Sequence, residues 1–219
     1  MRRLILFVIL GLVACGTAQA QVLPCIECDD RPNLLENPGF EDIAVPVDPD
    51  PVNPADAAAW NEFSNDPNTS LRSTVMPRTG SAHMDLEVID ANGFAGVFQG
   101  LPGSVSPGQI VTIQGWHKVL AGPVTRELKL EWHGAPQTRV DEILVPTTGE
   151  YEFFWLTAVA PAGTTGVTGT YAISTFGADM TEGRVFLDDM HLCIIPEPAS
   201  ITLVGLAALA LVGIRRRSK

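Results

Sequence analysis

The stretch PGQIVTIQGWHKVL, residues 107–120, indicates which kind of fold this chain adopts. A Pro-Gly turn is followed by a run of β-branched and aromatic residues, which is typical of a strand that leaves a tight turn. Because successive side chains of a strand point to opposite faces, Trp116 lies on the face opposite to Ile113. Its neighbours on that more polar face are Gln114 and Lys118.

The same pattern continues on both sides of this stretch. Segments rich in β-branched or aromatic residues occur at 93–99, 110–120, 128–133, 142–145, 151–159, 166–174 and 184–193. Turns that contain Gly or Pro separate them, and helix signals are nearly absent between residues 33 and 193. This rhythm predicts an all-β fold, namely an antiparallel β-sandwich of the jelly-roll kind.

Two segments and one loop allow more detailed predictions. Trp132 falls on the apolar face of segment 128–133 and Glu131 on its polar face, so we expect Trp132 in the core. Segment 151–159 is apolar on both faces, which favours a central position in its sheet. The proline-rich stretch 43–59 is predicted to be an exposed extended loop, because proline cannot donate to a sheet ladder.

The N-terminus resembles an export signal. A basic start is followed by an apolar run at residues 4–14 and by an A-x-A cleavage site at residues 18–20. We therefore expect a signal peptide with its signal helix at residues 1–20 and a mature chain that begins at Gln21. A second possibility stays open, because residues 12–15 resemble a lipobox in which Cys15 would be lipidated.

The C-terminus carries a second targeting signal. Pro196, Glu197 and Pro198 precede 16 apolar or small residues, 199–214, and then a basic tail. As a helix this run is about 24 Å long, so we expect a transmembrane helix with the arginines on the cytoplasmic side. The three elements together resemble the PEP-CTERM sorting signal, which an exosortase-type membrane protease recognises and removes. A plain membrane anchor is the alternative.

These two signals leave residues 21–198 as the mature part. All 25 acidic residues but only 8 of the 14 basic ones lie there, which gives a net charge of −17. Such a surface repels polyanions, so we exclude nucleic acid as a partner. The length is that of one domain with a sizeable core. We divide it into an N-terminal tail, 21–32, and a domain, 33–193, followed by the sorting segment, 196–219.

Three cysteines remain in the mature chain, which is expected to enter an oxidising compartment. Cys25 and Cys28 precede the first predicted strand, and Cys193 follows the last one. A disulfide between Cys193 and either Cys25 or Cys28 is therefore expected, and we name Cys28 as the candidate. A redox or zinc role for the Cys25/Cys28 pair is disfavoured, because one pair supplies only half of a tetrahedral zinc site.

The opening sequence NLLENPGFE, residues 33–41, resembles the first strand of family 4/9 carbohydrate-binding modules and of the wider galactose-binding-like jelly rolls. The resemblance continues through Trp60, a second strand at 81–86, the 105–116 segment and the closing VFLDDM at 185–190. It implies a carbohydrate-binding jelly roll over residues 33–192. Pro38 and the long loop after Asp42 depart from the family pattern.

The same resemblance implies a structural calcium ion that ties the first strand to the last. Carried onto this chain, its ligands would be Glu41 and Asp188, with Asp189 and backbone carbonyls completing an oxygen shell. Calcium takes six to eight hard oxygen ligands, which suits carboxylates. Asp188 shares its phase with Phe186 and Met190, so we expect it to point inward and to need a partner.

The resemblance also implies that an exposed aromatic side chain stacks on a sugar ring. We expect Trp116 in this role, with Gln114, Lys118 and Glu131 bonding hydroxyl groups; the alternative is that Trp116 is packing under a loop. No H-E-x-x-H or G-x-S-x-G motif occurs, and each histidine is expected at a sheet surface or turn, so we do not expect an enzyme.

These observations predict an exported, non-catalytic protein of the cell surface or extracellular matrix. It would be held in the inner membrane until an exosortase-type protease removes its C-terminal helix. Its expected partner is extracellular polysaccharide, bound or organised by a calcium-stabilised jelly roll. The alternative is a structural matrix protein that keeps the jelly roll and has no glycan site.

Overall fold

The computed structural model describes residues 22–23, 28, 30–44, 57–136, 139–144, 149–177 and 179–195. Within them every regular element is a β-strand. The strands are β1 (Val22–Leu23), β2 (Asn61–Ser64), β3 (Thr69–Ser73), β4 (His83–Val88), β5 (Phe94–Pro102), β6 (Ile110–Ala121), β7 (Thr125–His133), β8 (Arg139–Ile143), β9 (Glu152–Val159), β10 (Gly166–Ser174) and β11 (Gly183–Ile195).

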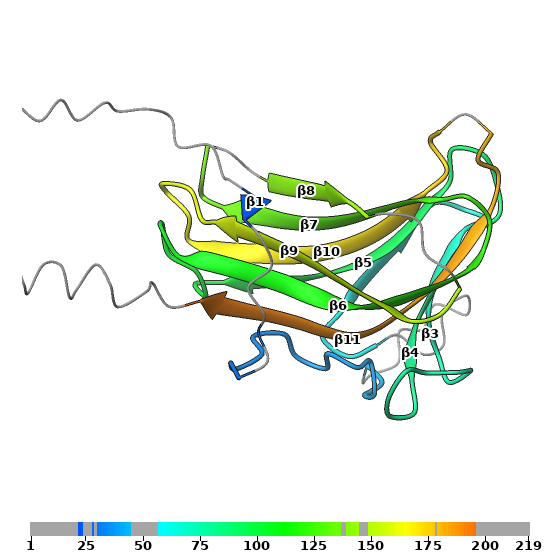
Figure 1. Ribbon diagram of the computed structural model, residues 1–219, viewed down its shortest axis with the longest axis horizontal. Helices are drawn as coiled ribbons and strands as arrows, with labels where there is room; N and C mark the ends of the chain where they lie inside the picture. Colours follow the sequence, from blue (N-terminus) through cyan, green and yellow to red (C-terminus); the bar gives the residue numbers. More distant parts are fainter. Residues whose placement is uncertain are drawn as a thin grey trace, which may run out of the picture.

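The strands form two sheets that pack face to face (Figure 1). A six-stranded sheet has the order β1-β9-β6-β11-β4-β3, and a five-stranded sheet has the order β2-β5-β10-β7-β8. All these neighbours pair antiparallel. The predicted antiparallel sandwich is therefore confirmed. The described residues hold no helix suited to crossing a membrane, and the helices predicted at 1–20 and 199–214 lie outside them.

The core lies between the sheets and follows the alternation read from the sequence. On β6, Val111 and Ile113 are fully buried in it, and Trp132 of β7 is 3% exposed, as predicted. The largest contributors from both sheets are Met84, Leu86, Ile113, Leu128, Leu130, Leu156, Tyr171, Ile173, Leu187 and Met190. Thr112, Gln114, Trp116 and Lys118 consequently point away from the core, to the outer face of the six-stranded sheet.

The opening segment 33–41 is not a strand, which corrects the prediction. It runs beside the second half of β11 without a regular ladder: the Leu34 amide donates to the Leu192 carbonyl, and the Met190 amide donates to the Pro38 carbonyl. Pro38 has no N–H, and Asn37 and Phe40 have positive φ angles of 47° and 58°, which a strand does not accommodate.

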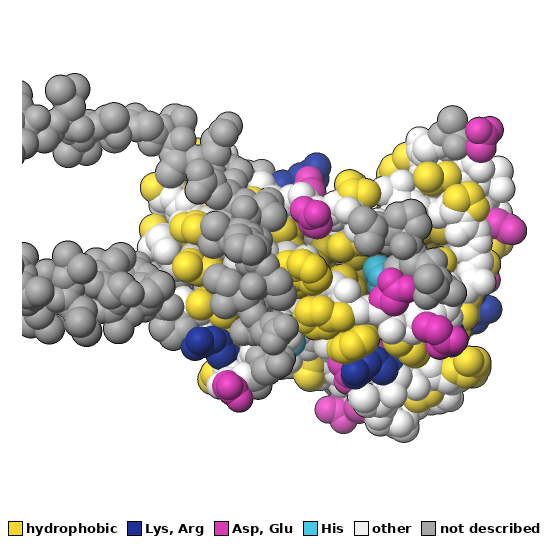
Figure 2. Space-filling model, viewed as in Figure 1, with side chains coloured by type: hydrophobic (Ala, Val, Ile, Leu, Met, Phe, Trp, Pro, Cys, Tyr) yellow, Lys and Arg dark blue, Asp and Glu magenta, His cyan; other side chains and the backbone are white. Residues whose placement is uncertain are grey.

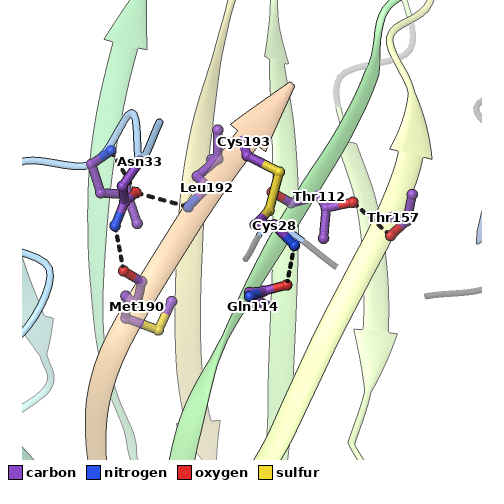
Figure 3. Close-up of a disulfide and its surroundings, with 9 residues drawn as sticks. Cys28, Asn33, Thr112, Gln114, Thr157, Met190, Leu192 and Cys193 are labelled. Carbon is purple, nitrogen blue, oxygen red and sulfur yellow. Dashed lines mark hydrogen bonds between the residues drawn. A yellow bond between two sulfur atoms is a disulfide. The ribbon is translucent and has the colours of Figure 1, made fainter. Parts of the chain in front are cut away.

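Asn33 compensates for the missing ladder. Its side-chain amide donates to the Met190 carbonyl, and its side-chain oxygen accepts the Leu192 amide (Figure 3). Phe40, at the other end of the segment, is fully buried, with its ring centroid 5.0 Å from that of Trp60. The opening and closing segments of the domain therefore lie side by side, as the resemblance implied.

Other strand bounds differ from the predictions. The strand predicted at 142–145 is β8, shifted to Arg139–Ile143, and the one predicted at 81–86 is β4, His83–Val88. Three short strands, β1, β2 and β3, were not predicted. β9 is not central, because its outer neighbour β1 pairs with only two of its residues. The predicted loop at 43–59 is described only at its ends, where Ile43 and Ala57 form an isolated bridge.

A disulfide joins Cys28 to Cys193 on the outer face of the six-stranded sheet (Figure 3). Both residues are fully buried. The Cys28 amide donates to the side-chain oxygen of Gln114 at 3.1 Å, beside a hydroxyl pair formed by Thr112 and Thr157. This bond and the disulfide hold the N-terminal segment against β6. Cys25, the other candidate for the pairing, lies outside the described residues.

Candidate functional site

The three predicted calcium ligands come together around the loop between β3 and β4. The Arg78 and Thr79 amides donate to Asp188 Oδ2 at 2.8 and 3.2 Å. Glu41 accepts the Ser81 amide at 3.0 Å and the Ser81 hydroxyl at 2.6 Å. Carboxylates from the opening segment and from β11 thus hold one loop through its backbone.

Asp188 is fully buried. The prediction that it shares a face with Met190 is wrong. The register of β11 against β6 shifts between Asp188 and His191, so the phase of the side chains changes there. Met190 enters the core, whereas Asp188 lies under Arg78 and Thr79. Burial and the nearby Asp189 carboxylate raise the pKa of Asp188 to about 6. A cation beside it would favour the charged form.

The carboxylates of Glu41 and Asp188 face a common space at Gly39. A Cβ atom on Gly39 would lie 3.7 Å from Glu41 Oε1 and 3.8 Å from Asp188 Oδ1. Gly80, with a φ of +59°, closes the other side, and a Cβ there would overlap the Glu41 carboxylate. The Ser81 hydroxyl bond is the main cause that lowers the pKa of Glu41, so this side chain is ionised at neutral pH.

These donors fit a hard cation only in part. The described residues hold no group of three or more His, Cys, Asp or Glu side chains spaced to bind a metal. Asp189 is directed to Arg78 Nη1 at 2.5 Å and to the Thr79 hydroxyl at 2.6 Å. An ion between Glu41 and Asp188 would therefore need backbone carbonyls as further ligands, which calcium accepts readily.

A row of aromatic side chains lies on the outer face of the six-stranded sheet. Trp116 pairs with Phe153 across β6 and β9, and their ring centroids are 5.4 Å apart. Phe153 and Trp155, two residues apart on β9, lie nearly parallel at 6.0 Å. We call Trp116, Phe153 and Trp155 the aromatic row. Trp155 is 41% exposed, so one large flat side chain of the row is open to solvent.

The four predicted sugar-binding residues have different surroundings in the structure. Trp116 belongs to the aromatic row, but the Arg78 guanidinium lies 3.8 Å from its ring centroid and covers that part. Gln114 is 5% exposed and bonded to Cys28, so it is not free for a ligand. Lys118 lies 3.8 Å from Glu150, with its ammonium 5.9 Å from the Tyr151 ring centroid.

Glu131 does not join them. It lies on β7 of the five-stranded sheet, where it accepts the Thr170 hydroxyl at 3.2 Å. Its side chain points away from the core, as predicted, and therefore to the opposite face of the sandwich from Trp116. Alternation within single strands cannot tell two outer faces apart, because that assignment requires knowing which strands share a sheet.

Sequence reasoning missed Trp155, Phe153 and Arg78. Phe153 and Trp155 have the same phase on β9, but its other face is apolar too, so the sequence alone could not assign the outer one. The register Trp116↔Phe153 and Gln114↔Trp155 resolves it. Arg78 comes from a loop and carries no periodic signal.

Two segments border the aromatic row along the strands. On one side, Cys28 lies against Gln114, the cross-strand neighbour of Trp155. On the other side, the Tyr151 hydroxyl donates to the Met76 carbonyl at 3.2 Å, which brings the loop between β3 and β4 across the sheet to β9. Figure 2 shows hydrophobic side chains gathered in the middle of this view, with charged groups around them.

The opposite face of the sandwich has its own aromatic patch. Phe63 of β2 contacts Phe94 and Phe98 of β5, at centroid distances of 6.2 and 6.1 Å. Phe176, which is 62% exposed, adds to it at 6.2 Å from Phe94. We call these four residues the phenylalanine patch. It shares its face with Glu131.

Two histidines are buried, which corrects their predicted surface positions. His83 is fully buried with neither ring nitrogen hydrogen-bonded, and its ring centroid lies 4.1 Å from that of Phe186. His117 Nδ1 shares a 2.6 Å hydrogen bond with the Tyr171 hydroxyl between the sheets. Burial lowers the pKa of each histidine to about 4, so both are neutral at physiological pH.

Comparison with known proteins identifies the tail. Residues 195–217 match the PEP-CTERM protein-sorting motif, which confirms the resemblance read from Pro196, Glu197 and Pro198. The motif implies export, with a C-terminal membrane anchor before processing. Its first residue, Ile195, is the last residue of β11. No curated protein sequence matches the chain.

Solved structures share the fold of the domain. TmCBM61, determined in complex with β-1,4-galactotriose, is 16% identical with a TM-score of 0.51, over 74% of this chain and 97% of that one. The stig cyclase Fisc from Fischerella sp. TAU is 13% identical with a TM-score of 0.53, over 82% and 100% of the two chains. The enzymatically active domain of bacteriophage CBA120 tailspike protein 4 is 16% identical with a TM-score of 0.52, over 74% and 21%. The domain is thus a carbohydrate-binding-module-like jelly roll, a fold that serves both binding modules and enzymes.

Proposed function

We propose that this exported protein binds extracellular polysaccharide through the aromatic row and performs no catalysis. The observation that carries the proposal is the contact series Trp116, Phe153 and Trp155 on a sheet face, with Trp155 41% exposed. Flat aromatic faces offer a sugar ring a large apolar contact at little cost in side-chain entropy. Lys118, at the margin of the row, supplies a donor for hydroxyl groups.

The likeness to TmCBM61 supports this function at the level of fold, and the sorting motif supports a location outside the cytoplasm. The absence of catalysis is also a proposal. It is supported by the sequence, which contains no H-E-x-x-H or G-x-S-x-G motif.

The test is retention of the full chain, solubilised in detergent, on a panel of immobilised polysaccharides that includes β-1,4-galactan, xylan and bacterial exopolysaccharide. We expect at least one to retain the protein. Trp155→Ala should weaken that retention about tenfold or more, since burying a large apolar side chain contributes about 1.5–3 kcal/mol. The melting temperature should stay nearly unchanged, because Trp155 lies outside the core, on the outer face of the six-stranded sheet, and is 41% exposed.

Phe98→Ala, in the phenylalanine patch, is the matched control. Loss of retention with Phe98→Ala but not with Trp155→Ala would move the binding surface to the opposite face and leave the function intact. No retention on any glycan would instead favour the alternative, a structural matrix protein of the cell surface.

We also propose that calcium binds between Glu41 and Asp188, with Asp189 at its margin. The support is the common space at Gly39 and the burial of Asp188 without a cationic side chain bonded to it. Addition of calcium to a chelator-treated sample should raise the melting temperature, because an ion bound only by the folded state stabilises it by mass action. Asp188→Asn should abolish the rise, and Asp141→Asn, on β8, should keep it.

A further inference from the structure

The described connections at one end of the sandwich contain no Asp, Glu, Lys or Arg. This is the end at which β6 begins and β9 and β11 finish, because Ile110 pairs with both Val159 and Ile195 (Figure 1, left). β5, β7 and β10 meet at the same end of the other sheet. The connections are residues 102–110, 133–136 and 159–166. We call these three connections the uncharged end.

The opposite end of the sandwich is acidic. At the chain's charged fraction of 18%, connections with the total length of the uncharged end would hold about four charges. The described connections at the opposite end contain no Lys or Arg, and their acids are Asp66, Asp90, Glu150, Asp179 and Glu182. The charge of the domain is therefore distributed unequally along its strands.

The charged residues that border the uncharged end balance one another. Asp30 and Arg31 lie close to Cys28, whose carbonyl accepts the Arg31 amide. Glu131 and Arg139 pair across β7 and β8. Each of these two pairs combines an acid with a base, so they add no net negative charge to the margin.

Backbone hydrogen bonds tie the connections of the uncharged end together. The Gly103 amide donates to the Thr165 carbonyl, and the Gly108 amide donates to the Ala160 carbonyl, each at 2.8 Å. The Thr165 amide donates to the His133 carbonyl at 2.8 Å. The exposed residues are Pro102, Gly103, Ser106, Pro107, Gly108, Gly134, Pro136, Ala162, Gly163 and Thr165. They form a preformed surface of small, uncharged residues.

The sorting motif holds this surface close to a membrane. The motif begins at Ile195, the last residue of β11, and it implies a membrane anchor before processing. The apolar run begins at Ala199, and four Cα steps reach at most about 14 Å. The headgroup layer on one side of a bilayer takes up about 5–8 Å of that length. Little chain is left to separate the domain from the bilayer.

We propose that the uncharged end rests on the lipid headgroups of the membrane until the tail is removed. Anionic headgroups repel a domain whose net charge is −17 over residues 21–198. Charges brought into the interface would also lose hydration. The uncharged end avoids both costs. The acidic end lies about 40 Å away, the length of the 13 residues of β11, which is several Debye lengths of about 8 Å.

This contact sets the orientation of the domain. The strands stand upright on the membrane, and both outer faces of the sandwich point sideways. Trp155 is four residues from Val159 on β9, which places the aromatic row about 13 Å above the uncharged end. The row therefore stays open to polysaccharide while the domain is anchored. The contact itself does not depend on polysaccharide binding.

The first test measures the distance between a nitroxide label and the headgroups. The full chain with Cys15→Ser and Cys25→Ser receives the label at Ala162→Cys, and the fraction that floats with phosphatidylglycerol vesicles is studied. Nickel chelated to a lipid headgroup relaxes only nearby nitroxides, so power saturation should show strong relaxation. The matched control is Ala91→Cys, an exposed alanine in the connection between β4 and β5, which should show none.

The second test adds charge to the uncharged end of the chain labelled at Ala162→Cys. Ser106→Glu with Thr165→Glu should lower the ratio of relaxed to unrelaxed signal about tenfold, the effect of two charges close to an anionic surface. The loss should be smaller in phosphatidylcholine vesicles. Ala91→Glu with Thr181→Glu, two exposed positions at the acidic end, should leave the ratio unchanged.

Three outcomes would overturn the proposal. The first is no relaxation at Ala162→Cys, or relaxation equal to that at Ala91→Cys. The second is an equal effect of the two pairs of glutamates. The third is a label at Ala162→Cys that is immobilised only in membranes containing the exosortase-type protease and is not relaxed by nickel, which would assign the uncharged end to the protease. Polysaccharide retention is measured separately on the panel.

Discussion

His117 and Tyr171 join the two sheets through a 2.6 Å hydrogen bond in the interior of the sandwich. His117 belongs to β6 of the six-stranded sheet and Tyr171 to β10 of the five-stranded one. Both are buried, and burial raises the pKa of the tyrosine hydroxyl, so it stays protonated throughout the physiological range. A buried polar contact therefore helps to fix how the two sheets align.

Tyr171→Phe should destabilise the domain by about 1–3 kcal/mol, because His117 then loses this partner without regaining water. Urea unfolding monitored by tryptophan fluorescence measures the change. Tyr151→Phe is the control, since its hydroxyl bonds the Met76 carbonyl at an exposed position. An equal loss of unfolding free energy in both variants would show that burial of the hydrogen bond does not determine its contribution.

Replacing Cys28 and Cys193 together by serine should lower the free energy of unfolding by about 2–5 kcal/mol. The disulfide closes a loop with a sequence separation of 165, which restricts the unfolded chain strongly. Differential scanning calorimetry under non-reducing conditions measures the loss. Cys25→Ser should leave the stability unchanged, and a loss as large as that of the double variant would mean that Cys25 forms the bridge instead.

His83→Leu should make stability less dependent on pH between about 6.5 and 4. Burial lowers the pKa of His83 to about 4 in the folded state, so the unfolded chain binds the proton first as pH falls. The contribution of neutral His83 is present above pH 6.5 and is lost as the pH falls through 4. At pH 5 the variant should regain about 2 kcal/mol relative to the unsubstituted protein.

The titration of Asp188 changes the folding stability in the opposite direction over part of this pH range. Its raised pKa of about 6 means that the folded state binds its proton first, which favours folding as the pH falls below 6. The comparison of His83→Leu with the unsubstituted chain cancels this contribution, because both retain Asp188. Parallel pH profiles for the two proteins would refute the assignment to His83.

Asn33→Ala should cost about 1–3 kcal/mol, since it removes the side-chain bonds to the Met190 carbonyl and the Leu192 amide. Hydrogen exchange should show the loss locally, as faster exchange of the Leu34 and Leu192 amides. Asn61→Ala, at an exposed position of β2, serves as the control. Unchanged exchange at Leu192 would show that the opening segment holds β11 without Asn33.

The arrangement of strands could be predicted largely from local patterns. The 110–120 and 166–174 segments carry uninterrupted strand-forming residues between Gly or Pro turns, and they became β6 and β10 with nearly the predicted bounds. β2 and β3 escaped prediction because they are four and five residues long and mostly polar. Their pairing comes from neighbouring strands, so no local signal marks them.

The candidate site could be predicted only as far as single elements define it. Trp116 was assigned to the outward face of its strand because alternation is a local property. Its grouping with Trp155, its separation from Glu131 and its cover by Arg78 all depend on which strands and loops become neighbours. Glu41, Asp188 and Asp189 were brought together by resemblance to a family, and local spacing alone would not have united positions so far apart in the chain.

The continuity between β11 and the sorting motif has a mechanical consequence. β11 is paired with β6 as far as Ile195, and it also pairs with β4. While the tail remains in the membrane, any force on the rest of the domain pulls lengthwise on this strand. Its ladder bonds to β6 then bear the load in shear, together rather than one by one, and the cross-link at Cys193 transfers part of the tension to the N-terminal segment. The tether is thus attached to a strand that two neighbouring strands and a cross-link hold in place.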